Sequence, residues 1–252
     1  MACISDEDKR LFSRLEDLLY LSEKRCSPCF LGFLDLREQA LLRQKLRSVN
    51  QQQWHFFGGY EDAERAFLAV YPDYYDSSVI EYPFTAVAFR YRRSQSLTHR
   101  DFLGTLLAAG VKRDTIGDIL CGDGLSVAFI STEITPFVCD QIQRVGGEGV
   151  TLTSDYTGDL PISRSYQDIH DTVASARLDA VVKALIHTSR EDAAQMIRTG
   201  LVSVDHLPTD SVAYFLSAPC TISIRGYGRY LIDQLGPETK KGRLQLFARK
   251  CI

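Results

Sequence analysis

Apolar residues recur at helical spacing in the first quarter of the chain. Leucines that begin at Leu11 and return four and seven positions later lie on one face of a helix. A capping box at Asp35 starts a second helix, and a third apolar run over residues 61–71 stops at Pro72. These patterns predict a small N-terminal α-helical domain over residues 1–80.

The pattern changes to an alternation of apolar and polar residues near residue 86. The expected elements are a strand over 86–92, a helix capped at Thr98 and closed by Gly110, strands over 116–120 and 125–131 joined by a Cys121–Gly124 turn, a helix that begins near Pro136, and a strand over 150–154. The order βαββαβ is that of the split βαβ plait of ferredoxin-like domains. We therefore expect such a plait over residues 81–160.

A third module follows a polar, aperiodic stretch, which we interpret as a linker over residues 161–174. A helix is predicted from Arg177 to Ile186, and Ser189 caps a second helix that Gly200 ends. Strands are expected over 201–205, 221–225, 229–235 and 244–249. The whole chain is thus expected to be α+β, with this third module over residues 175–252.

Charge is distributed unevenly between these modules. Residues 1–174 carry 18 Lys and Arg against 25 Asp and Glu, whereas residues 175–252 carry 11 against 7. A polyanion would therefore bind mainly at the C-terminal end, although ordinary charge scatter can produce the same counts.

Composition gives no sign of export or membrane insertion. The N-terminus is charged, no apolar run approaches the roughly 18 residues of a membrane span, and the seven scattered cysteines are an odd number for a disulfide framework. We expect a cytoplasmic protein with reduced thiols.

Individual residues of the third module match a known pattern. They are Arg177-Leu178-Asp179, Ser189-Arg190, Ala193-Ala194, Ile197, Arg198, Gly200 and Val202-Ser203-Val204. With two helices before a small sheet, this module resembles the S4 RNA-binding domain. The sheet side departs from that pattern, because Asp205 replaces the usual Asn and Ala218-Pro219-Cys220 replaces the usual Gly-Asp turn.

Further motifs extend the match over most of the chain. They are Phe33-Leu34-Asp35 with Arg37-Glu38-Gln39, Gly58-Gly59-Tyr60 with Ala63-Glu64-Arg65, His99 to Gly104 with Ile116 to Ile119, and Ile222 to Arg229 with Lys240 to Arg243. Together they resemble the YlmH family of ribosome-associated S4 proteins. The resemblance implies a non-enzymatic protein that binds rRNA or tRNA on the large ribosomal subunit during rescue of stalled translation. We expect it to act as a monomer without a cofactor.

Two arginines of the second predicted helix in this module are candidates for phosphate contacts. Arg190 and Arg198 are eight residues apart, which separates them by only about 80° around the helix. Ser189 and the free N–H groups of the helix start would add neutral donors, and Arg177 would complete the rim. A solvated helix face without a ligand is the alternative.

A second basic set surrounds two glycines. Its members are Arg225, Arg229, Lys240, Lys241 and Arg243, with Tyr227 between Gly226 and Gly228. Glycines permit the close approach of a polyanion. Tyr227 could stack on a base, or it could pack on the sheet as a turn residue.

Alternation in the plait directs Val87, Phe89 and Tyr91 toward the helices and leaves Arg90 and Arg92 on the open sheet face. Such a basic face would bind an RNA backbone or a protein, since plaits that stack bases present aromatic residues there. A purely structural plait is the alternative.

Other motifs carry little chemical information. Cys26-Ser27-Pro28-Cys29 is a weak candidate for a redox pair or half of a zinc site, because no second such pair and no histidine at ligand spacing accompanies it. Gly146 to Gly149 lacks the lysine of a phosphate loop and is expected to form a turn. We expect no metal site.

Two other functions remain open, an RNA-modifying enzyme with an accessory S4 domain and a protein-interaction adaptor. Pseudouridine synthases that carry an S4 domain have an Arg-Leu-Asp in their catalytic domain. Here Arg177-Leu178-Asp179 opens the S4 helix pair instead, and only the S4 sheet follows. Asp179 is therefore expected to cap or pair locally.

Overall fold

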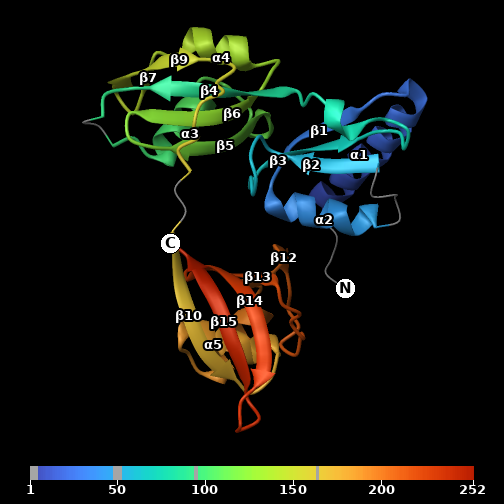
Figure 1. Ribbon diagram of the computed structural model, residues 1–252, viewed down its shortest axis with the longest axis vertical. Coiled ribbons are helices and arrows are strands. Elements are labelled where there is room, and N and C mark those ends of the chain that lie inside the picture. Colours follow the sequence, from blue (N-terminus) through green and yellow to red (C-terminus); the bar gives the residue numbers. More distant parts are fainter. Residues whose placement is uncertain (1–4, 48–52, 94–95, 163–164) are drawn as a thin grey trace. The chain divides into compact units, whose positions relative to one another are not determined.

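The computed structural model describes residues 5–47, 53–93, 96–162 and 165–252 (Figure 1). The chain divides into two compact units, one formed by the described residues up to 162 and one by those from 165 onward. None of the helices in these ranges combines the length and the apolar composition that a membrane crossing requires.

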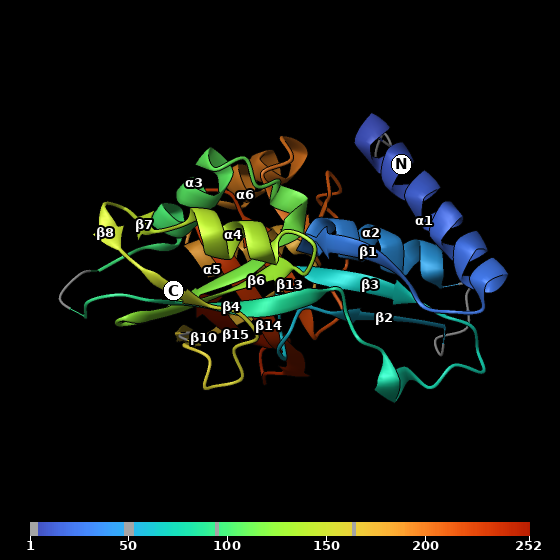
Figure 2. The same cartoon turned by 90° about the horizontal axis from the view of Figure 1, so that it is seen from above.

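The first unit begins with a mixed module of helices and strands. It contains α1 (Asp6–Arg25), β1 (Cys29–Leu34), α2 (Leu36–Leu46), β2 (Trp54–Phe57) and β3 (Ala66–Val70). The strands form an antiparallel sheet in the order β1-β3-β2 (Figure 2). The leucines of α1 and α2 pack in one cluster with those of β1 and β3. The predicted all-helical domain over residues 1–80 is therefore wrong.

The error arises from the apolar run over residues 61–71. The second half of this run forms strand β3, in which all five residues are buried. A short run that is buried on both faces shows no period that distinguishes a strand from a helix. Pro72 ends the run in either case.

The second module of this unit is the predicted plait. Its elements are β4 (Phe84–Arg90), α3 (His99–Ala108), β5 (Ile116–Cys121), β6 (Leu125–Ser131), α4 (Thr135–Gln141) and β9 (Thr151–Thr153). A small hairpin of β7 (Arg144–Val145) and β8 (Glu148–Gly149) precedes β9. The short helices η2 (Ser77–Val79) and η3 (Arg113–Thr115) lie outside the sheet. The order β5-β6-β4-β9, with antiparallel neighbours throughout, confirms the βαββαβ prediction. Val87 and Phe89 face the helices and pack with Phe102, as expected.

The open face of the plait differs from the prediction. β4 begins two residues earlier than expected, so Phe84 lies on this face near Phe129 of β6. The strand ends at Arg90, and Arg92 lies beyond it. Arg90 keeps its predicted side of the strand, so the face carries one of the two expected arginines together with the aromatic rings. The ring of Tyr60, from the first module, stacks on Phe129 with centroids 5.6 Å apart.

Arg65 and Asp118 join the first module to the plait. The Arg65 guanidinium donates from Nε to the carbonyl oxygen of Ile116 at 2.9 Å and from Nη2 to that of Phe33 at 2.6 Å. The Asp118 carboxylate accepts the backbone N–H of Glu64 at 2.7 Å and that of Arg65 at 3.0 Å. The bond to Ile116 and the two bonds to Asp118 cross the boundary between the modules and hold the two as one unit, while the bond to Phe33 fixes Arg65 within the first module.

Two glycines allow this close approach. A Cβ atom at Gly117 would lie 2.5 Å from the ring of Phe33. At Gly59, where φ is +101°, a Cβ atom would lie 2.2 Å from the ring of Phe129. Motifs that were noted in the sequence at 58–60 and 116–119 therefore serve the packing of the two modules.

The second unit packs two helices on one face of a six-stranded sheet. Its elements are β10 (Tyr166–Val173), α5 (Leu178–Ile186), α6 (Arg190–Arg198), β11 (Val202–Val204), β12 (Leu207–Pro208), β13 (Cys220–Ile224), β14 (Gly228–Glu238) and β15 (Leu244–Cys251). The sheet order is β10-β15-β14-β13-β11-β12. Both helices agree with the predicted spans, and Val181, Ile197 and Ile222 lie in their common core with the sheet.

The linker predicted over residues 161–174 is wrong for its larger part. Residues 166–173 form β10, which pairs along its full length with β15. The sequence hides this strand because it lies at the sheet edge and is mostly exposed, with Asp171 as well as Ile169 and Val173 on the side that faces the helices. Its pairing partner lies some 70 residues further along the chain, so no local pattern reveals it.

Candidate nucleic-acid interface

A buried carboxylate organises two of the predicted site residues at the start of the helix pair. Arg177 is the N-cap of α5 and Arg190 the first residue of α6. The Arg177 guanidinium donates to both carboxylate oxygens of Asp179, at 3.0 and 3.2 Å, and Arg190 donates from Nε at 2.8 Å. The Asp179 side chain is 3% exposed, whereas that of Arg190 is 60% exposed. The expected local pairing of Asp179 is confirmed.

The side chains of Arg177, Asp179 and Arg190 form an ion triad in which all three groups are charged. Burial raises the pKa of Asp179, but the hydrogen bonds and charges of Arg177 and Arg190 outweigh burial and hold that pKa below its usual value. The hydrogen bond to Asp179 in turn raises the pKa of Arg177. One carboxylate serves two guanidinium groups, so the triad has a net positive charge and presents oriented N–H donors at the surface.

Ser189 caps α6, as the sequence predicted, and this role engages the hydroxyl that was also expected to donate to a phosphate. Its hydroxyl oxygen accepts the backbone N–H of Asp192 at 3.0 Å, and its O–H donates to the Asp192 carboxylate at 2.7 Å. Glu191 and Asp192 also make the first turn of α6 acidic. The hydroxyl therefore caps the helix and is already engaged, so the anion-binding capacity at this end rests on the arginines.

Arg198 lies at the other end of α6 and is exposed. It is eight residues from Arg190, about 12 Å along the helix axis. Ala193, Ala194 and Ile197 form the buried side of α6. The helix thus presents cations near both ends of its solvent side.

The second predicted basic set does not form one cluster. Arg225, Tyr227 and Arg229 lie at the β13–β14 turn, whereas Lys240, Lys241 and Arg243 lie at the β14–β15 turn. β14 has 11 residues, and at about 3.3 Å per residue its two ends lie about 30 Å apart. The grouping made from the sequence is therefore wrong.

Hydrogen bonds place each turn near a different end of the helix pair. The backbone N–H of Arg225 donates to the carbonyl oxygen of Leu201, three residues after Arg198, at 2.9 Å. Arg243 donates from Nε to the hydroxyl of Thr172 at 2.9 Å and from Nη2 to the Thr172 carbonyl. Thr172 belongs to the strand that leads into α5. The structure thus associates Arg225 with the Arg198 end and Arg243 with the Arg177 end.

Tyr227 occupies the tip of its turn between two glycines with positive φ, Gly226 at 87° and Gly228 at 111°. Its side chain is 46% exposed. The turn therefore presents an aromatic ring to solvent, with Arg225 exposed beside it. Lys240 and Lys241 are likewise exposed.

The remaining motifs noted in the sequence lie at a helix end, a strand start and a turn. Cys26 caps α1 with a left-handed backbone, and Cys29 is buried at the start of β1. Gly146 and Gly147 form the predicted turn, between β7 and β8. Across the ranges that the structure describes, no group of three or more His, Cys, Asp or Glu residues is arranged to hold a metal ion.

Comparison with known proteins identifies the class and then the family. Residues 80–158, which span the plait, match the family model described as "Putative RNA-binding domain in YlmH". The chain is therefore a mixed α/β protein with an RNA-binding-type plait. It is 32% identical over 213 residues to the ribosome-associated protein quality control protein P2 of Bacillus subtilis strain 168, and the match covers 84% of this chain and 82% of that protein. The chain belongs to the YlmH family.

A solved structure supports the fold. The cell division protein ylmH from Streptococcus pneumoniae superposes with a TM-score of 0.51 at 17% identity, over 61% of this chain and 94% of that chain. The family membership that the sequence motifs indicated is confirmed by the family model and the Bacillus subtilis relative.

Proposed function

We propose that the second unit is an S4 domain that binds structured rRNA or tRNA through the solvent side of α5 and α6. The observation that carries this proposal is the buried Asp179, which orients Arg177 and Arg190 at the surface. Guanidinium groups held in place lose less conformational freedom on binding a phosphate than free side chains do. Arg198 and Arg225 extend the cationic surface at the far end of α6.

The proposed setting is the large ribosomal subunit in the cytoplasm, during rescue or quality control of stalled translation. The name of the Bacillus subtilis relative associates that protein with the ribosome and with quality control. The match of the plait to an RNA-binding family model supports an RNA partner for the first unit as well.

We further propose that the protein is not an enzyme. An Arg-Leu-Asp triplet that served catalysis would need an accessible carboxylate, but Asp179 is buried and bonded to two guanidinium groups. A carboxylate in this state cannot reach a substrate atom. This pairing supports a structural role for the triplet rather than a catalytic one.

The ribosomal setting predicts co-sedimentation. In a sucrose gradient of cell lysate at low salt, the protein is expected to travel with large ribosomal subunits and to leave them as salt is raised, because phosphate contacts are screened. The measurement is detection of the protein across the fractions. Its presence only at the top of the gradient, even after translation is stalled, would contradict the proposal.

The non-enzymatic role predicts unchanged RNA. Incubation with rRNA or tRNA, with and without divalent metal ions, is expected to leave every nucleoside and phosphodiester intact. Nucleoside mass spectrometry and gel analysis test this. A modification or cleavage product that depends on the protein would contradict this role.

A further inference from the structure

The segment that precedes β13 presents a phenylalanine to solvent in the second unit. Phe215 is 70% exposed, more than any other phenylalanine that the structure describes. It belongs to none of the motifs noted in the sequence. Because a single exposed apolar side chain is common on protein surfaces, the groups around Phe215 must show whether it has a role.

The backbone fixes Phe215 directly opposite Arg177, with which it forms an antiparallel β-bridge. One backbone hydrogen bond of 2.8 Å lies on each side of this pair, from Leu178 N–H to the carbonyl oxygen of Tyr214 and from Leu216 N–H to that of Ala176. Phe215 and Arg177 are thus the non-hydrogen-bonded kind of antiparallel pair. In such a pair the two side chains leave on the same side, with Cβ atoms about 4.5 to 5.5 Å apart.

The neighbours of Phe215 in sequence set the direction of its ring. Leu216 is buried in the core of the second unit. Successive side chains of an extended segment point to opposite sides, so Phe215 points away from that core. The backbone N–H of Tyr214 donates to the carbonyl oxygen of Ser211 at 3.0 Å, which closes a turn just before the ring. The position of the ring is therefore fixed by the backbone on both sides.

The side chain opposite Phe215 is a cation that is held in place. The Arg177 guanidinium is bonded to Asp179, and 33% of the Arg177 side chain stays exposed. Arg190 shares the same carboxylate, so the ion triad beside the ring is positive overall. A nucleotide complements both features, since its phosphate binds cations and its base stacks on aromatic rings. An apolar protein surface would complement the ring but gain nothing from the adjacent positive charge.

We propose that Phe215 stacks on an unpaired RNA base while Arg177 and Arg190 bind a phosphate next to that base. A base inside a duplex is already stacked on both sides, so the partner is a base in a bulge, a loop or a strand end. This inference rests on the proposed S4 function and deepens it. It specifies the class of RNA element that the domain recognises, a helix interrupted by an unpaired base.

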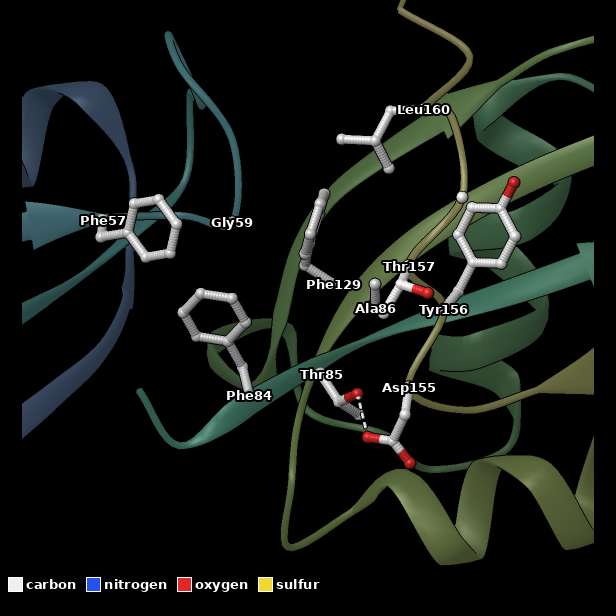
Figure 3. A pocket seen from close by; sticks show the side chains of 11 residues that line it. Phe57, Gly59, Phe84, Thr85, Ala86, Phe129, Asp155, Tyr156, Thr157 and Leu160 are labelled. Carbon is white, nitrogen blue, oxygen red and sulfur yellow. Dashed lines mark hydrogen bonds between the residues drawn. The ribbon is translucent and has the colours of Figure 1, made fainter. Parts of the chain in front are cut away.

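The aromatic face of the plait differs from this site. Figure 3 shows Phe57 of β2, Phe84 of β4 and Phe129 of β6 around a hollow of the first unit. The ring centroid of Phe84 lies 5.9 Å from that of Phe57 and 6.1 Å from that of Phe129, and Tyr60 stacks on Phe129. Packing of the rings on one another accounts for these residues, whereas the ring of Phe215 is left largely to solvent.

The test uses the full-length protein and two RNA hairpins with the same stem, one fully paired and one with a single bulged aminopurine, a fluorescent analogue of adenine. Fluorescence anisotropy of end-labelled hairpins is expected to show about 5- to 100-fold tighter binding of the bulged hairpin, the range for one base stacked on one ring. In unlabelled hairpins the aminopurine fluorescence should fall on binding, because stacking on an aromatic ring quenches it.

Variants separate stacking from charge attraction. Phe215→Ala is expected to abolish the preference for the bulged hairpin and to change binding of the paired hairpin by less than about twofold, because phosphate contacts carry that binding. The dependence of log K on log salt should stay the same, since the ring has no charge. Phe215→Trp should retain the preference. Phe137→Ala is the matched control, because it removes a ring that is 42% exposed on α4 of the other unit.

Several results would overturn the proposal. They are equal binding of the two hairpins by the unaltered protein, or a preference for the bulged hairpin that survives in Phe215→Ala. Loss of the preference in Phe57→Ala instead would assign the base to the plait. If Phe215→Ala weakens binding to purified large ribosomal subunits but not to the bulged hairpin, the ring contacts a protein and the stacking role is wrong. Thermal melting by circular dichroism verifies that each variant is folded.

Failure of this inference is separable from failure of the proposed S4 function. Arg190→Ala with Arg198→Ala should weaken binding of both hairpins and flatten the salt dependence. Such a result together with an unaltered Phe215→Ala variant would keep the S4 function and remove the stacked base. Binding of neither hairpin by the unaltered protein would count against both.

Discussion

Replacement of Arg190 and Arg198 together by alanine is expected to weaken binding of the cognate structured RNA by about 10- to 100-fold, as for the loss of two charge-assisted contacts. If both arginines contact phosphates, each displaces counterions, and log K falls with log salt by about 0.7 to 0.9 per contact. The double variant is therefore expected to flatten this slope by about 1 to 2 units. The measurement is a binding titration at several salt concentrations.

The structure indicates that this variant should fold. Arg198 is exposed, and Arg177 remains to pair with Asp179 after Arg190 is lost. The matched control is Arg10→Ala with Arg14→Ala, which removes the same charge from exposed positions of α1 in the other unit. A folded Arg190 and Arg198 variant with unchanged affinity and slope would show that α6 is not the RNA site. The turn that carries Arg225 and Tyr227 would then be tested next.

Phe102→Ala is expected to lower the free energy of unfolding of the first unit by about 3 to 5 kcal/mol. Phe102 is 1% exposed and packs edge-on against Phe89 with ring centroids 5.4 Å apart. Removal of the ring leaves a cavity that the plait sheet and α3 cannot close without shifting.

Urea unfolding followed by the fluorescence of Trp54, the one tryptophan in the chain, tests this effect. Trp54 lies in the first module, so its signal also reports whether Arg65 and Asp118 make the two modules unfold together. Leu107→Ala on the same helix is the control, because Leu107 is 43% exposed and should lose less than about 1 kcal/mol. A change below about 1 kcal/mol for Phe102→Ala would contradict the assigned burial.

Local sequence determined the elements whose signals lie within a few residues of each other. The capping box at Asp35 is present as predicted: the carboxylates of Asp35 and Glu38 each accept the other residue's backbone N–H at 2.8 Å. The plait order and the two helices of the second unit were also predictable, because caps, glycine turns and side-chain period are short-range properties. The family followed from motifs spread over the chain.

Tertiary structure alone decided the features that depend on distant partners. β3 is a strand because β1 and β2 pair with it on both sides, and β10 is a strand because β15 pairs with it. Strand β14 is long enough to place Arg225 and Arg229 at one end and Lys240, Lys241 and Arg243 at the other, although these residues looked like one basic set in the sequence. The aromatic face of the plait exists because Phe57, Phe84 and Phe129 come together from β2, β4 and β6. In each case the deciding contact joins residues far apart in sequence, so the physical information lies in the packing and not in any local pattern.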